Sequence, residues 1–152
     1  MKPKVYFYNM RAGRRSESIS NKVYKLFDVA GFKEIVEPDK LTAIKIHFGE
    51  RGNNGFINPI YVRKIVDKIK QYGGKPFLTD SNTLYKGSRS NGVDHLVTAI
   101  ENGFAYAVVN APLVISDGIY SKDSVDVHIG KKHFDTVKIS SAIYYADSMM
   151  VM

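Results

Sequence analysis

The sequence predicts an α/β domain: a parallel or mixed sheet with helices on its faces and a β-hairpin excursion near the C-terminus. Apolar and polar residues alternate over residues 41–48, which is the two-residue period of a strand. An amphipathic helix that begins at Asn58, a cap residue followed by proline, leads into a short apolar strand at residues 76–79. These three elements form a βαβ unit. Two alternating segments, residues 123–129 and 133–140, flank a Gly-Lys-Lys turn, which is typical of a hairpin.

The chain before this unit is predicted to contribute one strand and one helix. Residues 5–10 are expected to form the first strand, and a basic loop follows it. Ser16 or Ser18 is expected to cap the helix, and Gly31 to end it. The apolar stripe of this helix consists of Ile19, Val23, Leu26, Phe27 and Ala30.

The strand at residues 41–48 carries polar side chains on one of its two faces. Lys45 and His47 point to that face, and Ile44, Ile46 and Phe48 point to the other. Central strands of α/β sheets are usually apolar on both faces. Two interpretations therefore stay open: the strand lies near an edge of the sheet, or its polar face lines a polar pocket.

A polar loop follows the strand at residues 76–79, and a second amphipathic helix follows the loop. The apolar stripe of that helix consists of Val93, Leu96, Val97 and Ile100. The helix is expected to end at Gly103, and residues 105–109 are expected to form another strand. A helical turn is predicted at residues 141–147. Residues 148–152 predict the start of a buried strand.

The length and composition of the chain limit the classes of protein to which it can belong. The 152 residues suffice for one domain with a core, and we expect a single α/β domain over residues 1–152. No apolar run approaches the roughly 18 residues that cross a bilayer, and we expect no membrane partner. The chain has no cysteine, so its own residues form neither a disulfide nor a thiolate metal site. This composition favours a cytoplasmic location.

The net charge of +7 raises the prospect of an anionic partner. The densest basic cluster is Arg11, Arg14 and Arg15, in a glycine-containing loop. We find no motif of a nucleic-acid-binding fold, and we do not expect nucleic acid as the partner. The charge is also explained by lysines that solubilise surface helices, and the anionic partner that we consider is a small molecule.

Side chains able to transfer protons or bind ligands concentrate at the ends of two predicted strands, residues 41–48 and 76–79. Ligands of α/β proteins bind at the carboxyl ends of strands and beside helix N-termini. The candidates for proton transfer are His47 and Asp80. The candidates for substrate binding are Lys45, Asn82, Lys86, Ser88, Arg89, Asn91 and His95. No pair of histidines has a metal-binding spacing, so no metal site is predicted.

Each of these candidates also has a structural interpretation. The polar loop at residues 80–91 is equally consistent with a solvated loop and a helix cap. Asp80 can hydrogen-bond the loop backbone, and His47, which with Glu50 forms the most enzyme-like pair, can be a hydrogen-bonded structural residue. His95 is expected opposite the apolar stripe of its helix.

Several motifs resemble one known family. They are His47-Phe48-Gly49-Glu50, the segment of residues 79–85 (TDSNTLY), the segment of residues 87–91 (GSRSN) and Asp94-His95-Leu96. From about Lys4 to its last residue the chain is similar to the domain-of-unknown-function family 362, the uncharacterised Fe–S center proteins. The resemblance implies four-iron four-sulfur clusters and a redox or electron-transfer role. Those clusters would be held by cysteines in a missing C-terminal part, and none is expected in this chain.

We therefore expect a fragment of a longer protein, since the chain stops within an apolar segment. The first hypothesis is the substrate-binding part of a cytoplasmic iron–sulfur protein of redox type. Its site would combine the loops at residues 49–58 and 80–91. Lys45, Lys86 and Arg89 would hold an anionic group, Asn82 and Ser88 would orient it, and His47 or Asp80 would move protons. The alternative is a non-catalytic scaffold that docks a cluster domain or a partner protein and exposes an apolar patch near residues 148–152.

Overall fold

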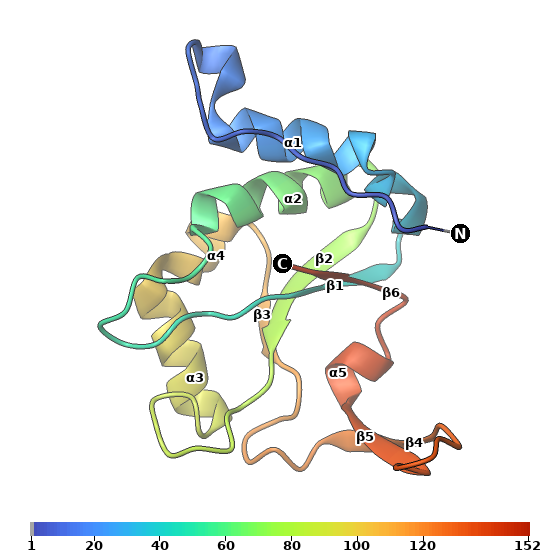
Figure 1. Cartoon of the computed structure of the whole chain (residues 1–152). Helices are drawn as coiled ribbons and strands as arrows, with labels where there is room; N and C mark the ends of the chain where they lie inside the picture. The colour runs from blue at the N-terminus through green and yellow to red at the C-terminus, as the bar shows by residue number, and fades with distance from the viewer. Residues whose placement is uncertain (1) are drawn as a thin grey trace.

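A computed structural model describes residues 2–152, and its centre is a parallel sheet with helices packed on it (Figure 1). The sheet order is β3-β2-β1-β6, and each neighbouring pair is parallel. Its strands are β1 (Leu41–Lys45), β2 (Lys75–Asp80), β3 (Leu113–Ile115) and β6 (Ser148–Val151). A separate antiparallel pair consists of β4 (Ser124–His128) and β5 (Thr136–Ser140). The predicted α/β class, the parallel sheet and the C-terminal hairpin are confirmed.

Residues 2–152 form five α-helices, of which the first precedes the first strand. They are α1 (Ile19–Val29), α2 (Pro59–Gln71), α3 (Gly92–Ala99), α4 (Tyr106–Val109) and α5 (Ser141–Tyr144). Short 3-10 turns lie at Arg15–Glu17 and Phe32–Ile35, and a π-helical turn at Ile100–Phe104 continues α3. Within residues 2–152, no helix is long and apolar enough to cross a membrane.

The ends of α1 and α2 follow from the residue types there. Ser18 caps α1 by accepting a hydrogen bond from the Asn21 backbone N–H, and Gly31 follows the helix at φ 79°. Asn58 caps α2 by accepting from the Ile60 N–H, and Pro59 opens its first turn. The predicted start and end of α1 and the predicted start of α2 are confirmed.

The core lies between the sheet and α2, with α1 packed outside α2. Ile44 and Leu78 on neighbouring strands pack with Val62, Val66 and Ile69 of α2, and all five are fully buried. Ile46 and Phe48 continue the buried face beyond the end of β1. Because β1 lies between β2 and β6, it is not an edge strand, and Lys45 on its other face meets a polar cluster.

Two predicted strands are wrong. Residues 5–10 form no strand, because they run along the outside of α1 and do not reach the sheet (Figure 1). Residues 105–109 form the short helix α4, which ends where Asn110 adopts the left-handed conformation at φ 59°. The next strand, β3, begins three residues later, after Pro112. A short apolar run does not by itself distinguish a strand from a buried helical turn, so both errors come from such runs.

The predicted orientation of α3 is also wrong. Val93, Val97 and Ile100 of the expected apolar stripe are exposed. The buried face consists of Gly92, His95, Thr98 and Ala99. Gly92 explains the rotation, because a Cβ built on it would lie 2.8 Å from the Gly118 carbonyl oxygen. The helix approaches the loop after β3 through its small and polar face, and His95 is turned into the protein.

The close approach at Gly92 gives a stability prediction. Gly92→Ala should destabilise the fold by about 1–3 kcal/mol, because the added methyl group meets backbone that cannot move aside cheaply. Urea unfolding measures the change. Gly87→Ala is the matched control, because a Cβ there would lie 3.5 Å from the Tyr85 side chain, an ordinary contact. Equal stability of the Gly92 variant and the parent would contradict the packing described for α3.

Candidate functional site

The carboxyl ends of β1, β2 and β3 meet at one edge of the sheet, because the three strands are parallel and adjacent. Lys45 is the last residue of β1, and Asp80 is the last residue of β2. Asp117 follows β3 by two residues. The loop after β1 contributes Glu50, and the loop after β2 contributes Arg89. Charged side chains from five segments therefore gather at the place where α/β proteins bind ligands.

Arg89 is the centre of this cluster. Its side chain is 4% exposed, and its guanidinium donates in three directions. Nη1 donates to Asp80 Oδ2 at 3.0 Å, and Nε donates to Glu50 Oε1 at 2.9 Å. Nη2 donates to Glu50 Oε1 at 2.6 Å and to the Tyr85 hydroxyl at 2.8 Å. A guanidinium fork suits such carboxylate contacts, which are the strong class of hydrogen bond.

Glu50 is held in its ionised form. The hydrogen bonds from Arg89, and after them the one from the Tyr85 hydroxyl, lower the pKa of the Glu50 carboxyl to about 2. Ser88 Oγ adds a weaker contact to Glu50 Oε2 at 3.4 Å. Glu50 thus ties the loop after β1 to the loop after β2, as the predicted combination of the two loops requires.

Asp80 is shared between two cations. Lys45 Nζ lies 3.1 Å from Asp80 Oδ1, and Arg89 Nη1 lies 3.0 Å from Oδ2. The Asp80 side chain is buried, whereas Lys45 is partly exposed. Lys45 and Arg89 thus balance the charges of Asp80 and Glu50, and the fifth charged side chain, Asp117, accepts hydrogen bonds from Asn82. Burial of these charges requires such partners, because an unpaired buried charge is very costly.

His95 is fully buried behind Asp80. Its Nδ1 lies 3.3 Å from Asn82 Oδ1, and Asn82 Nδ2 donates to Asp117 and to the Gly118 carbonyl. Asn82 Oδ1 is therefore an acceptor, and His95 Nδ1 carries the proton. His95 Nε2 has no hydrogen-bond partner within residues 2–152 and lies 3.8 Å from Asp80 Oδ2. Burial lowers the pKa of His95 to about 4, so the ring is neutral at neutral pH.

His47 stands at the solvent side of the same cluster. Arg89 Nη2 lies 2.9 Å from His47 Nε2, and the Gly49 N–H donates to His47 Nδ1 at 2.9 Å. A guanidinium and a backbone N–H donate hydrogen bonds and do not accept them. A neutral imidazole accepts at one nitrogen only, so the ring satisfies one of these two donors at a time. His47 is exposed and remains in reach of a ligand, whereas Asp80 is enclosed by its cations.

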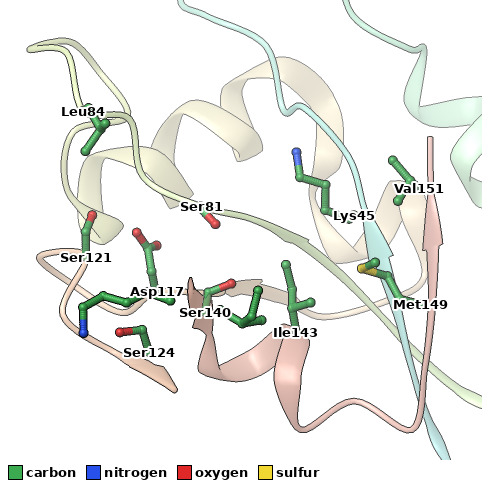
Figure 2. Close-up of a pocket in the computed structure, with 12 residues that line it drawn as sticks. Lys45, Ser81, Leu84, Asp117, Ser121, Ser124, Ser140, Ile143, Met149 and Val151 are labelled. Carbon is green, nitrogen blue, oxygen red and sulfur yellow. The ribbon is translucent and has the colours of Figure 1, made fainter. Parts of the chain in front are cut away.

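A groove of about 640 Å³ opens beside this cluster (Figure 2). Lys45 and Asp117 belong to both the cluster and the groove wall. The polar lining residues are Lys45, Asp117, Lys138 and four serines, Ser81, Ser121, Ser124 and Ser140. The apolar lining residues are Leu84, Ile139, Ile143, Met149 and Val151. Figure 2 shows that these side chains come from β1, β6, α5, the hairpin and the loops after β2 and β3.

The candidates from the sequence separate into three groups. Seven lie together at the strand ends, namely Lys45, His47, Asp80, Asn82, Ser88, Arg89 and His95. Asn91 caps α3 by accepting from the Val93 and Asp94 N–H groups. Lys86 is exposed at the tip of its loop, where it forms no ion pair or hydrogen bond with residues 2–152.

Several groove residues were missed by the sequence interpretation. Asp117 follows β3, and the strand before it was expected near residues 105–109, so the residue was not placed at a strand end. Ser124, Lys138 and Ser140 belong to the hairpin, which sequence alone does not place against the sheet. Tyr85 lies within the loop that was singled out, but no spacing pairs it with Glu50.

The residues present do not fit an iron–sulfur cluster. The chain has no cysteine, and no group of three or more potential metal-ligating side chains gathers within residues 2–152. Buried carboxylates here are paired with Lys45 and Arg89 instead. A cluster of the kind that the resemblance implies requires ligands from outside this chain.

Comparison with known proteins gives one match. The family model described as domain of unknown function (DUF362) matches residues 42–152, which is more than half of the chain and includes the whole cluster around Arg89. Neither the curated proteins nor the solved structures contain a match to the chain.

The paired charges predict a large cost for removing Arg89. Arg89→Met should destabilise the fold by about 3–5 kcal/mol, because Glu50 and Asp80 lose their shared partner. Adding Glu50→Gln to that variant should recover part of the loss. Arg51→Met, which removes an exposed partner of Glu101, should cost at most about 1 kcal/mol. Denaturant unfolding checks the series, and a loss of stability smaller than that of the Arg51 variant would contradict the pairing of Arg89 with Glu50 and Asp80.

Buried His95 predicts an acid-sensitive fold. The pKa of His95 is about 4 in the folded chain, whereas its ordinary value is 6.5. Between pH 4 and pH 6.5 the unfolded chain therefore binds more protons than the folded chain. Stability should therefore fall as pH falls from 6.5 towards 4, by about 2–3 kcal/mol. In the variant His95→Gln, stability should change little between pH 6.5 and 4. The loss of stability that comes from protonation of Glu50, between pH 4.5 and about 2, should remain. Thermal melting across pH tests it; an equally steep decline in the variant would exclude His95 as the cause.

Proposed function

The chain belongs to the DUF362 family, and we propose that its groove at the strand ends binds a small molecule with an anionic group and an apolar body. The observation that carries the proposal is the mixed lining of the groove. Two lysines and four serines line it together with Asp117 and with aliphatic side chains. Pockets of this kind bind ligands through apolar contact and a few convergent polar groups.

Lys45 is the principal anion-binding group in this proposal. One side of its ammonium faces Asp80, and its two other N–H groups remain for a ligand. Asp80 is itself held by Arg89, so Lys45 keeps its place without a ligand. Lys138 pairs with Asp126 at 2.7 Å, but both are well exposed, and such a surface pair is weak enough to exchange for a ligand.

Arg89 supports the site rather than contacting the ligand. All of its close contacts within residues 2–152 are to Glu50, Asp80, Tyr85 and His47. The serine hydroxyls, which both donate and accept, orient the anionic group. Asp117 accepts from the backbone and side chain of Asn82, which fixes the loop after β2 beside the groove.

The wider context of this binding role is also a proposal. The resemblance to uncharacterised Fe–S center proteins supports a place in the ligand-binding part of a cytoplasmic redox protein. Its clusters would be held by cysteines outside these 152 residues. In that setting the groove would bind the molecule on which the redox centre acts. His47, exposed beside Arg89, is the group placed to exchange a proton with solvent.

Titration calorimetry with acetate, hexanoate, decanoate and hexyl phosphate tests the proposal. Affinity should rise by about fourfold for each methylene group that the apolar lining residues bury. Lys45→Gln should weaken every ligand about tenfold or more, because a charge-assisted contact is lost. Lys25→Gln, an exposed lysine on α1, removes the same charge away from the groove and should change nothing.

Two results would count against this proposal. Binding that Lys25→Gln weakens as much as Lys45→Gln would reflect net charge rather than the groove. No saturable binding by any of the four anions would remove the small-molecule role and favour the second candidate.

A scaffold role is the second candidate, and the exposure of β6 favours it. Met149 is 46% exposed and Val151 is 65% exposed, on the edge strand of the sheet. A second, apolar depression of about 300 Å³ lies over the same face, lined by Leu41, Phe77, Pro112, Val114, Ala142 and Tyr145. An exposed apolar sheet face of this kind suits contact with another protein. The two candidates differ in whether a small anion saturates the groove.

A further inference from the structure

The positive charge of the protein is concentrated at one end of the chain. Residues 1–33 contain eight lysines and arginines but only two acidic residues, so they carry six of the seven excess positive charges. The remainder of the chain is nearly neutral. Since net charge of one sign on one segment creates a strong local field, this segment determines which anionic partner the protein meets.

These charges lie on the outermost layer of the fold. Residues 2–10 run along the outer side of α1, which itself packs on α2 (Figure 1). Lys22 of α1 holds the segment in place by donating to the Asn9 carbonyl at 2.8 Å. Tyr8 and Met10 line a small cavity with Val23 and Leu26. The segment is thus attached to the protein without belonging to its core.

Exposed apolar side chains accompany the charges. Val5 is 89% exposed, Phe7 is 83% exposed and Met10 is 69% exposed. The basic residues of the segment are also exposed, and they form no salt bridge within residues 2–152; they are Lys2, Lys4, Arg11, Arg14 and Arg15. We call these eight side chains the basic surface.

We propose that the basic surface docks the protein on an anionic membrane. Lysine and arginine next to an anionic bilayer each strengthen binding, and aliphatic and aromatic side chains enter the interface between headgroups and acyl chains. The basic surface has both features on one short segment. It revises the expectation, drawn from the lack of a spanning segment, that no membrane is a partner.

The residue types favour a membrane over nucleic acid. Single-stranded nucleic acids are bound by aromatic rings that stack on bases. Among residues 2–15 only the ring of Phe7 is more than half exposed, since Tyr6 and Tyr8 are each 40% exposed. Val5 and Met10 do not stack, but they do insert into a lipid interface. Docking through this layer also leaves the groove free, because α1 and α2 separate it from the carboxyl ends of the strands (Figure 1).

Sedimentation of the full chain with vesicles tests the proposal. The protein should bind vesicles that contain phosphatidylserine and not vesicles of phosphatidylcholine alone, and added salt should weaken binding. Replacing Arg11, Arg14 and Arg15 by glutamine should weaken it about 100-fold, at about fivefold for each charge. Val5→Ser with Phe7→Ser should weaken it about tenfold or more. All five residues are exposed, so circular dichroism should show an unchanged fold.

A matched control separates the surface from net charge. Replacing Lys122, Lys131 and Lys132 by glutamine removes the same three charges from an exposed region near the hairpin and should leave binding unchanged. An equal loss in that control overturns the proposal, as does failure of the parent to bind phosphatidylserine. A fluorescent uridine oligonucleotide that binds and removes the protein from the vesicles would assign the surface to nucleic acid and also overturn it.

Discussion

The ion pairs of Arg89 are the interaction on which the carboxyl edge of the sheet depends. A buried guanidinium with two carboxylate partners joins the end of β2 to the loops after β1 and β2. Cations contact both Glu50 and Asp80 in this arrangement, and Lys45 is held in place through Asp80. The two cations and these two carboxylates balance in charge, so the value of the pairing lies in geometry. It positions one lysine, one histidine and two loops at the edge of the sheet beside the groove.

The orientation of α3 also shapes the carboxyl edge of the sheet. An ordinary amphipathic helix would turn Val93, Val97 and Ile100 inwards, but Gly92 allows the opposite face to meet the loop after β3. This brings His95 behind Asp80 and leaves aliphatic side chains in solvent. Burial keeps the imidazole of His95 neutral. Its Nε2 lies near the Asp80 carboxylate, and no group within residues 2–152 donates a hydrogen bond to this nitrogen. A fold that leaves apolar residues exposed and buries a histidine departs from local patterning, and such departures are typical of functional sites.

Charge divides the molecule into two regions for which we propose different partners. The groove combines paired charges, hydroxyls and apolar side chains, and we propose one small amphipathic anion as its ligand. The outer layer combines unpaired basic side chains with exposed Val5 and Phe7, which suits an extended anionic surface. Because α1 and α2 lie between them, each region is free to act while the other is occupied (Figure 1).

The sequence by itself determined the class of fold, both strands that carry the cluster, the caps of α1 and α2, and the hairpin, because these depend on local periodicity and on residues such as Asn58, Pro59 and Gly31. It also identified seven residues that the strand ends bring together. Only the tertiary structure decided which face of α3 is buried, that residues 5–10 lie outside the sheet and that Arg89 pairs with Glu50 and Asp80. Those outcomes depend on contacts between residues far apart in the chain, and no local pattern encodes such contacts.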